Sequence, residues 1–417
     1  MRSKLYLVFI ILCLSFCLPG RSFGYSVLTH EAIIDACWDK AIQPLLKLKY
    51  PLTTDKDIEG ARAYAYGGVV MPDMGYYPFE KGLLSNLVHY VRTGEFVEAL
   101  LTEAQNVDEY AFALGVLCHY YGDIYGHGIG INRSEPIIYD KVKQKYGSVV
   151  TYEQDRVSHT RTEFGFDVLQ VVRGNYVSKS YHDFIGFKIS RPVMERAFQK
   201  TYGLDMNKAF PNLGMSITTF RFSIVHLIPL ITRVAWINRK NDILKTTPSA
   251  KAKTFTYKMQ RMKYYTDEEV VDASPGLGNY IIAFVIKIMP KFEKLRAMKF
   301  KVPGPDAEKI FIQSFDTTVA KYTAALEKIA ANDTDPDNVN YDTGKKTEKG
   351  EYHLADNTYD QLLLKLDKAN YQDMSPGLKQ NISTFYGNSY EGEHKAKLSA
   401  KEKKIYNALK KMKSEQK

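Results

Sequence analysis

Helical periodicity dominates this chain of 417 residues, and convincing alternating strands are scarce. In Asp108 to His127, apolar residues recur three and four positions apart, and Asn106 or Asp108 is placed to cap the start. Hydrophobic residues make up 45% and charged residues 25% of the chain, which is typical of a globular protein with a buried core. The sequence therefore predicts an all-α fold, a bundle of many helices.

Four further segments are predicted to be helical. Thr218 to Ile237 is apolar but carries charged residues, so we expect a buried helix kinked near Pro229 rather than a membrane span. Ile281 to Met289 is a shorter apolar helix, and Thr358 to Leu366 and Lys401 to Met412 complete the set. The last 25 residues contain nine Lys against three Glu, which predicts a solvated basic helix, with attraction to an anionic membrane surface as the alternative.

The first 24 residues have the pattern of a secretory signal peptide. A basic start precedes the apolar run Leu5 to Leu18, and Ser22 and Gly24 supply small residues for cleavage before Tyr25. Cleavage would remove three basic residues and lower the formal net charge from +10 to +7. We therefore expect an exported protein, and the sequence does not distinguish periplasm from extracellular space. Two cysteines, Cys37 and Cys118, would remain, enough for at most one disulfide.

The mature chain divides into a helical domain over residues 25–300 and a helical C-terminal extension over 301–417. Asp, Asn, Gly and Lys are abundant in 332–350, which predicts an exposed loop. Three aspartates alternate there from Asp333 to Asp337, as in a calcium loop. Asn338 stands where that loop needs Gly, and no Glu closes it, so the pattern does not support a calcium site.

Two groups of potential metal ligands recur at helical spacing. His119, Asp123 and His127 are four residues apart, and each step of four advances by about 40° around a helix, so their side chains share one stripe. His159 and Glu163 repeat this spacing. Imidazole and carboxylate are ligands that zinc accepts in the absence of cysteine, and two facing helices can hold several ions. One such pair alone is a weak signal, because buried histidines are common in cores.

Four glycines accompany the first stripe, although Gly costs a helix about 1 kcal/mol against Ala. Their presence predicts the close approach of a neighbouring helix or of substrate. The four are Gly115, Gly122, Gly126 and Gly128. Cys118, next to His119, is expected to pack as a small apolar group, and the four histidines without partners are expected to be surface or packing residues. These are His182, His226, His353 and His394.

Several motifs together resemble the zinc-dependent phospholipase C family, including the amino-terminal domain of glycosylphosphatidylinositol-specific phospholipase D. The matching stretches are Tyr25-Ser-Val-Leu-Thr-His30, Gly68-Val-Val-Met-Pro-Asp73, His89-Tyr90, Gly115-Val-Leu-Cys-His119-Tyr-Tyr-Gly-Asp123-Ile-Tyr-Gly-His127 and His159-Thr-Arg-Thr-Glu163. The ligand order is also similar to that of the fungal zinc-dependent single-strand nucleases. The resemblance covers residues 25 to 170, and the spacing of Asp123 and His127 is closer to the phospholipase D branch.

The resemblance implies two to three zinc ions. One would be held by the Tyr25 amino group and carbonyl, His30 and Asp123. A second would be held by Asp73, His89, His119 and Asp123, and a third by His127, His159 and Glu163. Every side-chain position of the motif is filled by a competent ligand. The family often begins its mature chain with Trp, and Tyr25 stands there instead.

The chemistry that this ligand set implies is hydrolysis of a phosphodiester. Metal lowers the pKa of a bound water and offsets charge on phosphate oxygens, and Asp73 is placed to orient or deprotonate the attacking water as well as to bind metal. We therefore expect a zinc-dependent phospholipase C-like hydrolase that acts on phospholipid or a similar phosphodiester. Peripheral contact of the protein with a membrane surface is compatible with this expectation. The alternatives are a single-strand nuclease, whose partner would be nucleic acid, and a non-catalytic exported zinc-binding surface protein.

The segment after Asp73 bears on the choice of substrate. Its apolar residues could form a hydrophobic lip for lipid, although an ordinary packed loop explains them nearly as well, and tyrosines could equally stack nucleic-acid bases. The residues are Pro72, Met74, Tyr76, Tyr77, Pro78 and Phe79. The sequence leaves the natural substrate, the side of cleavage and the oligomeric state open.

Overall fold

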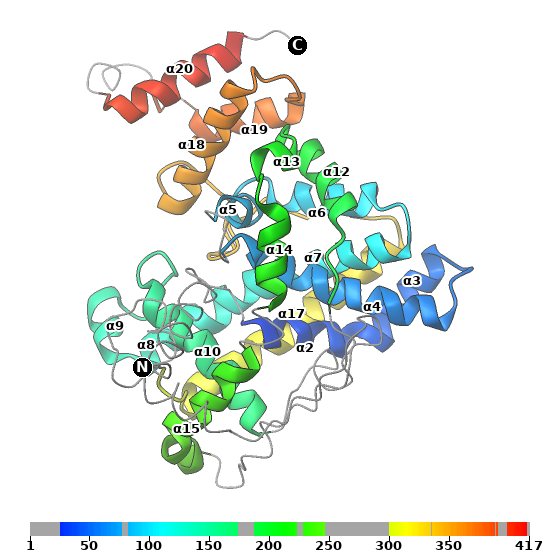
Figure 1. The fold of residues 1–417 in the computed structure, drawn as a ribbon. Helices are drawn as coiled ribbons and strands as arrows, with labels where there is room; N and C mark the ends of the chain where they lie inside the picture. Colours follow the sequence, from blue (N-terminus) through cyan, green and yellow to red (C-terminus); the bar gives the residue numbers. More distant parts are fainter. Residues whose placement is uncertain are drawn as a thin grey trace, which may run out of the picture.

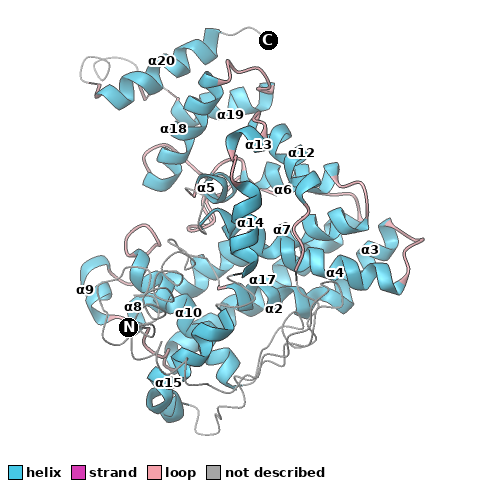
Figure 2. Cartoon of the chain, in the orientation of Figure 1, coloured by secondary structure: helices cyan, strands magenta, loops and turns pink. Residues whose placement is uncertain are grey.

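The protein is all-α, as predicted, in a computed structural model that describes residues 26–76, 82–173, 187–222, 228–246, 300–334, 336–387, 389–390 and 398–414. Within these ranges no strand occurs, and the only strand-like pairing is one antiparallel bridge between Val339 and Lys346. Figure 2 shows helices throughout. None of the helices in the described ranges is both long and apolar enough to cross a membrane.

The first part of the chain contributes short and medium helices. In order they are α2 Val27–Cys37, the π-helix η1 Trp38–Ile42, α3 Gln43–Lys49, α4 Asp55–Val70, the 3₁₀-helix η2 Met71–Tyr76, α5 Leu83–Tyr90, α6 Thr93–Glu103, α7 Val107–Tyr125, the π-helix η3 Gly126–Ile131, α8 Asn132–Ile138, α9 Asp140–Tyr146 and α10 Arg156–Arg173. The later helices are α12 Arg191–Tyr202, α13 Met206–Ala209, α14 Leu213–Phe222, α15 Ile228–Thr246, α17 Pro305–Ala330, α18 His353–Lys368, α19 Pro376–Tyr386 and α20 Ala400–Ser414.

Helix α7 lies at the centre of the molecule, and α2, α4 and α17 pack around it (Figure 1). Its start is fixed by Asn106, whose side chain accepts a hydrogen bond from the Glu109 amide at 3.0 Å. Residues of α7 between Tyr110 and His119 are buried without exception, which makes this helix the core of the bundle. The prediction of a helix from Asp108 to His127 is confirmed, except that its last turns widen into η3.

Helices α4 and α7 cross at two glycines. A Cβ atom built on Gly68 would lie 2.0 Å from the carbonyl oxygen of Phe112, and one built on Gly115 would lie 2.1 Å from that of Ala65. Side chains larger than hydrogen therefore cannot occupy these positions without separating the helices. The prediction that Gly115 serves the close approach of a neighbouring helix is confirmed, whereas a Cβ on Gly128 would meet nothing within 4 Å.

The C-terminal helices α18, α19 and α20 lie together at one end of the molecule, orange to red in Figure 1. The helices predicted at Thr358 to Leu366 and Lys401 to Met412 are present within α18 and α20. α18 packs on α5, and α20 packs on α18 through an apolar face that includes Ile405 and Leu409. Lys401 of α20 also pairs with Asp360 of α18 at 2.8 Å, so part of the basic tail faces acidic groups of the protein.

Two predicted helices fall partly or wholly outside the described residues, and one predicted loop is wrong at its centre. Of the helix predicted from Thr218 to Ile237, the described parts lie in α14 and α15, with Pro229 in the first turn of α15, and residues 223–227 between them lie outside the described part. The helix predicted at Ile281 to Met289 lies wholly outside it and stays a prediction. The exposed loop at 332–350 is wrong at its centre, because Asn340, Tyr341 and Asp342 are buried.

Candidate metal centre

Three groups of buried side chains that can bind metal lie around the C-terminal half of α7 and the turn that follows it. They are His30, His119 and Asp123; Asp73, His89 and His119; and His127, His159 and Glu163. Each set of ligand atoms lies within 4.8 Å of one another. The structure thus brings together all eight side chains that the motifs singled out, and none of them is more than 3% exposed.

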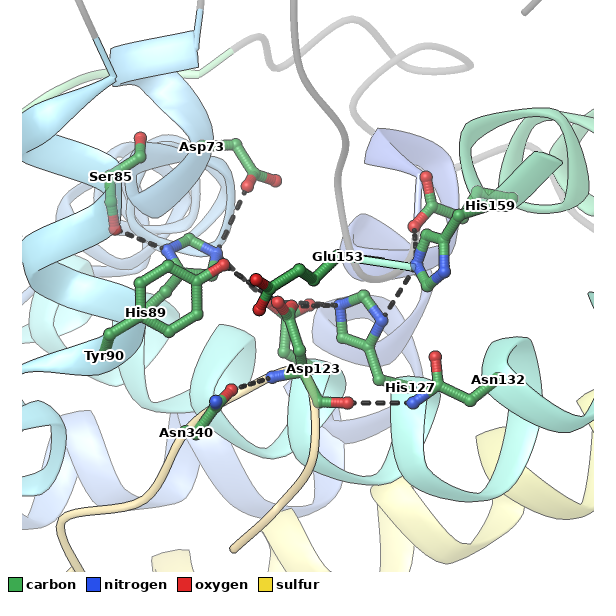
Figure 3. Close-up of polar contacts among 12 residues, drawn as sticks. Asp73, Ser85, His89, Tyr90, Asp123, His127, Asn132, Glu153, His159 and Asn340 are labelled. Carbon is green, nitrogen blue, oxygen red and sulfur yellow. Dashed lines mark hydrogen bonds and ion pairs between the residues drawn. The ribbon is translucent and has the colours of Figure 1, made fainter. Parts of the chain in front are cut away.

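Asp123 joins the first two groups. Its Oδ1 lies 3.3 Å from Nε2 of His30, and its Oδ2 lies 3.2 Å from Nε2 of His89 and 3.1 Å from Nε2 of His119. Asp73 approaches the same place from the 3₁₀-helix η2, with its Oδ1 3.4 Å from Nε2 of His89 (Figure 3). One carboxylate therefore touches three imidazoles that come from three different helices.

The rings are held in place from behind. The Val69 carbonyl lies 2.8 Å from Nδ1 of His119, and the Ser85 carbonyl lies 2.7 Å from Nδ1 of His89. A backbone carbonyl can only accept, so each Nδ1 carries the proton and each Nε2 is left for the metal side. The Val69 contact depends on the glycine crossing of α4 and α7, since that crossing brings the end of α4 to His119.

His30 reaches the centre because Gly122 lacks a side chain. A Cβ on Gly122 would lie 2.8 Å from Cε1 and Nδ1 of the His30 ring. The start of α2 is anchored by Asp167 of α10, which accepts hydrogen bonds from the Leu28 amide at 3.2 Å and from the Thr29 hydroxyl at 2.6 Å. Together these contacts place the first turn of α2 against α7.

The third group lies one step further along the chain. His127 belongs to η3, whose wider turn follows α7, and His159 and Glu163 face it from α10. Nδ1 of His127 lies 3.1 Å from Nε2 of His159 (Figure 3). The same Nε2 lies 2.9 Å from Oε1 of Glu163. π-Helical turns are rare in proteins overall, but those that occur are often found at functional sites. His127 lies in such a turn and faces α10.

The metal-free electrostatics separate the histidines into two kinds. Burial, with a neighbouring His119, lowers the pKa of His30 to about 4, and burial lowers that of His127 to about 4. Burial opposes protonation of His89 and His159 too, but the flanking carboxylates prevail and raise the pKa of each ring to about 10. The site is therefore a compact mixture of neutral and cationic rings among carboxylates.

Zinc fits this arrangement. Zinc–nitrogen bonds are about 2.0–2.1 Å long, so two ligands of one tetrahedral ion lie roughly 3.3 Å apart; the nitrogen–oxygen contacts of Asp123 with the three histidines span 3.1 to 3.3 Å. Oδ1 of Asp73 and both oxygens of Asp123 are buried without a hydrogen bond of acceptable geometry. Buried carboxylate oxygens that face imidazole nitrogens in this way are explained by cations between them.

Two carboxylates beside this centre escaped the sequence analysis. Glu135 of α8 is fully buried with an Oε2 3.4 Å from Nδ1 of His159. Asp342, in the loop after α17, has an Oδ1 3.5 Å from Nε2 of His127. Neither has a partner at helical spacing. Glu135 follows the polar residues Asn132, Arg133 and Ser134, so nothing in the pattern marked it, and Asp342 sat in a stretch whose composition indicated an exposed loop.

The other residues singled out in the sequence lie outside the metal centre or outside the described residues. Tyr25, the predicted backbone ligand, lies outside the described residues, as do His182, His226 and His394, whereas His353 is exposed at the start of α18. Pro72, Met74 and Tyr76 are buried in η2, so these three form a packed turn rather than an exposed lip, and Tyr77, Pro78 and Phe79 lie outside the described part. Cys118 is buried, and neither it nor Cys37 forms a disulfide.

Comparison with known proteins bears on this region of the chain. Residues 29–212 match the sequence model of a family described as zinc dependent phospholipase C. No curated protein and no solved structure matches the chain in the two other comparisons. The matched region contains His30, Asp73, His89 and the ligands of α7 and α10, whereas Asp342 follows it. The part of the chain that carries the eight metal-ligand side chains is therefore similar to the zinc-dependent phospholipase C family.

Proposed function

We propose that the protein is a zinc-dependent phosphodiesterase of the phospholipase C type, acting on a phospholipid or a similar phosphodiester. The observation that carries this proposal is the convergence of eight buried ligands in three groups, of which the first two share His119 and are bridged by Asp123. Structural zinc sites are usually closed, four-ligand sites for a single ion, whereas adjoining sites with shared carboxylates are typical of phosphate-ester hydrolysis.

The protein side chains have distinct tasks in this proposal. Bound zinc would supply Lewis acidity to a water molecule and to phosphate oxygens. His30, His89, His119, His127, His159, Asp123 and Glu163 would hold the ions. Asp73, buried among the ligands, would orient or deprotonate the attacking water as well as bind metal.

Export is a second part of the proposal. The signal pattern over residues 1–24 and cleavage before Tyr25 would leave a free amino group five positions before His30, close to the predicted first zinc. N-terminal sequencing of the secreted protein tests this directly. A mature chain that starts at another residue would contradict the assignment of Tyr25 as a ligand.

The decisive experiment pairs metal analysis with two substrates. Purified mature protein is expected to contain two or three zinc ions and to release a phosphorylated head group from phosphatidylcholine in a chelator-sensitive reaction. Cleavage of single-stranded DNA instead would favour the nuclease alternative. Bound zinc without either activity would favour the non-catalytic surface protein, and absence of zinc would contradict the proposal.

A further inference from the structure

The loop after α17 reaches the metal centre although it lies outside the family match. Thr93 of α6 pins it, because the Thr93 hydroxyl donates to the Val339 carbonyl at 2.8 Å and accepts from the Val339 amide at 2.9 Å. The Tyr341 amide then donates to the His89 carbonyl at 3.1 Å. The Tyr341 ring lies against the His89 ring, with centroids 5.1 Å apart. Residues 336–352 are thus fixed against the helices that carry the ligands.

Asp342 occupies the buried end of this loop. Its Oδ1 lies 3.5 Å from Nε2 of His127. Its Oδ2 accepts hydrogen bonds from the hydroxyls of Tyr90 at 2.8 Å and Tyr352 at 2.5 Å. Its main-chain carbonyl accepts a hydrogen bond from Nδ2 of Asn132 in α8 at 2.8 Å. The Asp342 amide also donates to Oδ1 of Asn340 at 2.9 Å, so both main-chain groups of Asp342 are held. The side chain thus has one carboxylate oxygen toward His127 and the other toward two tyrosines.

The two nitrogens of His127 face different neighbours. Nδ1 lies toward His159 and the third ligand group, at 3.1 Å from Nε2 of His159. Nε2 lies nearest to Oδ1 of Asp342, at 3.5 Å, with Oδ2 of Asp123 further away at 3.9 Å. A neutral imidazole carries one proton, so the nitrogen that binds metal is the one without it. We propose that Asp342 holds the proton of His127 on Nε2 and thereby leaves Nδ1 free for the metal. This inference rests on the proposed zinc centre and makes Asp342 a positioning residue.

The hydrogen bonds to Asp342 give the proposal a specific consequence. Because both tyrosine hydroxyls donate to Oδ2, an asparagine at this position places its amide oxygen on the tyrosine side. Its NH₂ group then faces Nε2 of His127 and needs an acceptor there. The proton of His127 moves to Nδ1, which is the wrong tautomer for metal binding.

The test compares Asp342→Asn, Asp342→Ala and the control Asp337→Asn, which changes an exposed carboxylate of the same loop. Zinc stoichiometry and affinity are measured by competition with a chromophoric chelator, and the tautomer of His127 by ¹⁵N shifts of histidine-labelled protein, assigned with His127→Gln. We expect one zinc of Asp342→Asn to bind about 10–100-fold more weakly, with the remaining zinc bound as in wild type and the proton of His127 on Nδ1. Asp342→Ala should be no worse, and the control unchanged.

A role in packing alone predicts the opposite order, with the nearly isosteric asparagine milder than alanine. That order, or unchanged zinc affinity and tautomer in Asp342→Asn, would overturn the inference. Loss of all zinc ions together in Asp342→Asn would also overturn it, because the effect would then be on the fold. A wild-type protein without zinc is a separate outcome, which contradicts the proposed function before any variant is compared.

Discussion

At the scale of single residues, the centre depends on one carboxylate that contacts several imidazoles. Asp123 touches His30, His89 and His119, and burial alone would favour its neutral form. The neighbouring His119 nevertheless lowers the pKa of Asp123 well below its usual range. The negative charge of Asp123 is thus an integral part of the site. Removing this charge would leave three imidazole rings without the carboxylate that all of them contact.

Replacement of Asp123 by asparagine should therefore remove zinc and activity together. Since loss of an outer partner of a metal ligand already costs about 10–100-fold, we expect loss of this shared ligand to cost at least about 100-fold in activity. Zinc content is expected to fall as well. Asp39→Asn, at an exposed position of η1, is the matched control and should retain both. Full zinc content in Asp123→Asn would show that Asp123 is not a shared ligand.

The ligand residues were within reach of sequence reasoning, and their supports were not. His119, Asp123, His159 and Glu163 repeat at helical spacing, so their grouping follows from helix geometry. The residues that orient the rings come from elsewhere: a carbonyl at Val69 and carboxylates far along the chain. A carbonyl has no residue identity to read, and a lone acidic residue has no period, so neither leaves a pattern.

At the scale of elements, the close crossing of α4 and α7 positions the ligands. The crossing brings the end of α4 to His119 and leads into η2 with Asp73. The glycines of α7 predicted such a contact, but the sequence did not say which helix would make it. The widening of α7 into η3 was also missed, because apolar periodicity is nearly the same for one π-helical turn as for an α-helical one.

Two glycines of α4 offer a matched test of this crossing. Gly68→Ala would place a Cβ 2.0 Å from the Phe112 carbonyl, so we expect destabilisation of about 1–3 kcal/mol or more. Gly60→Ala meets nothing within 4 Å in the same helix and should stabilise by about 0.5–1 kcal/mol. Chemical denaturation of the metal-free proteins measures both. Equal changes in the free energy of unfolding for the two variants would mean that α4 and α7 can move apart at the crossing without cost.

The C-terminal loop shows where composition misleads. Its polar residues predicted exposure, yet Asp342 is buried because Tyr90, Tyr352 and Asn132 donate hydrogen bonds to its oxygens. The side-chain oxygen of the buried Asn340 in turn accepts a hydrogen bond from the Asp342 amide. Composition reports how a segment would interact with water. It does not report hydrogen-bonding partners supplied by other elements.

At the scale of the whole molecule, metal binding should be coupled to protons. His89 and His159, with pKa values of about 10, are protonated at pH 7 without metal, whereas His30 and His127, at about 4, are neutral. The raised values mean that the charged pairs stabilise the metal-free fold at neutral pH and lose this contribution as pH rises through about 10. Zinc needs the unprotonated rings and displaces both protons.

Calorimetric titration of the metal-free protein with zinc at pH 7 checks this coupling. In buffers of different ionisation enthalpy, the apparent enthalpy should vary with a slope of about two protons for the loaded centre. His89→Gln should lower that slope by about one. A slope near zero would contradict the protonation pattern of the metal-free site. The holoprotein should also unfold at a higher temperature than the chelated protein, since zinc binds the folded state.

The contact between Tyr90 and Asp342 joins residues that are 252 positions apart in the chain. Closing so long a loop costs entropy that only later contacts repay, and such topologies fold slowly. Synthesis from the amino terminus produces every ligand of the matched region long before Asp342 exists. The nascent protein can therefore bring its metal-binding histidines together early. Asp342, which contacts His127 from outside the ligand groups, becomes available only after the loop that follows α17 has been synthesised. The order of synthesis is thus part of the maturation of the centre.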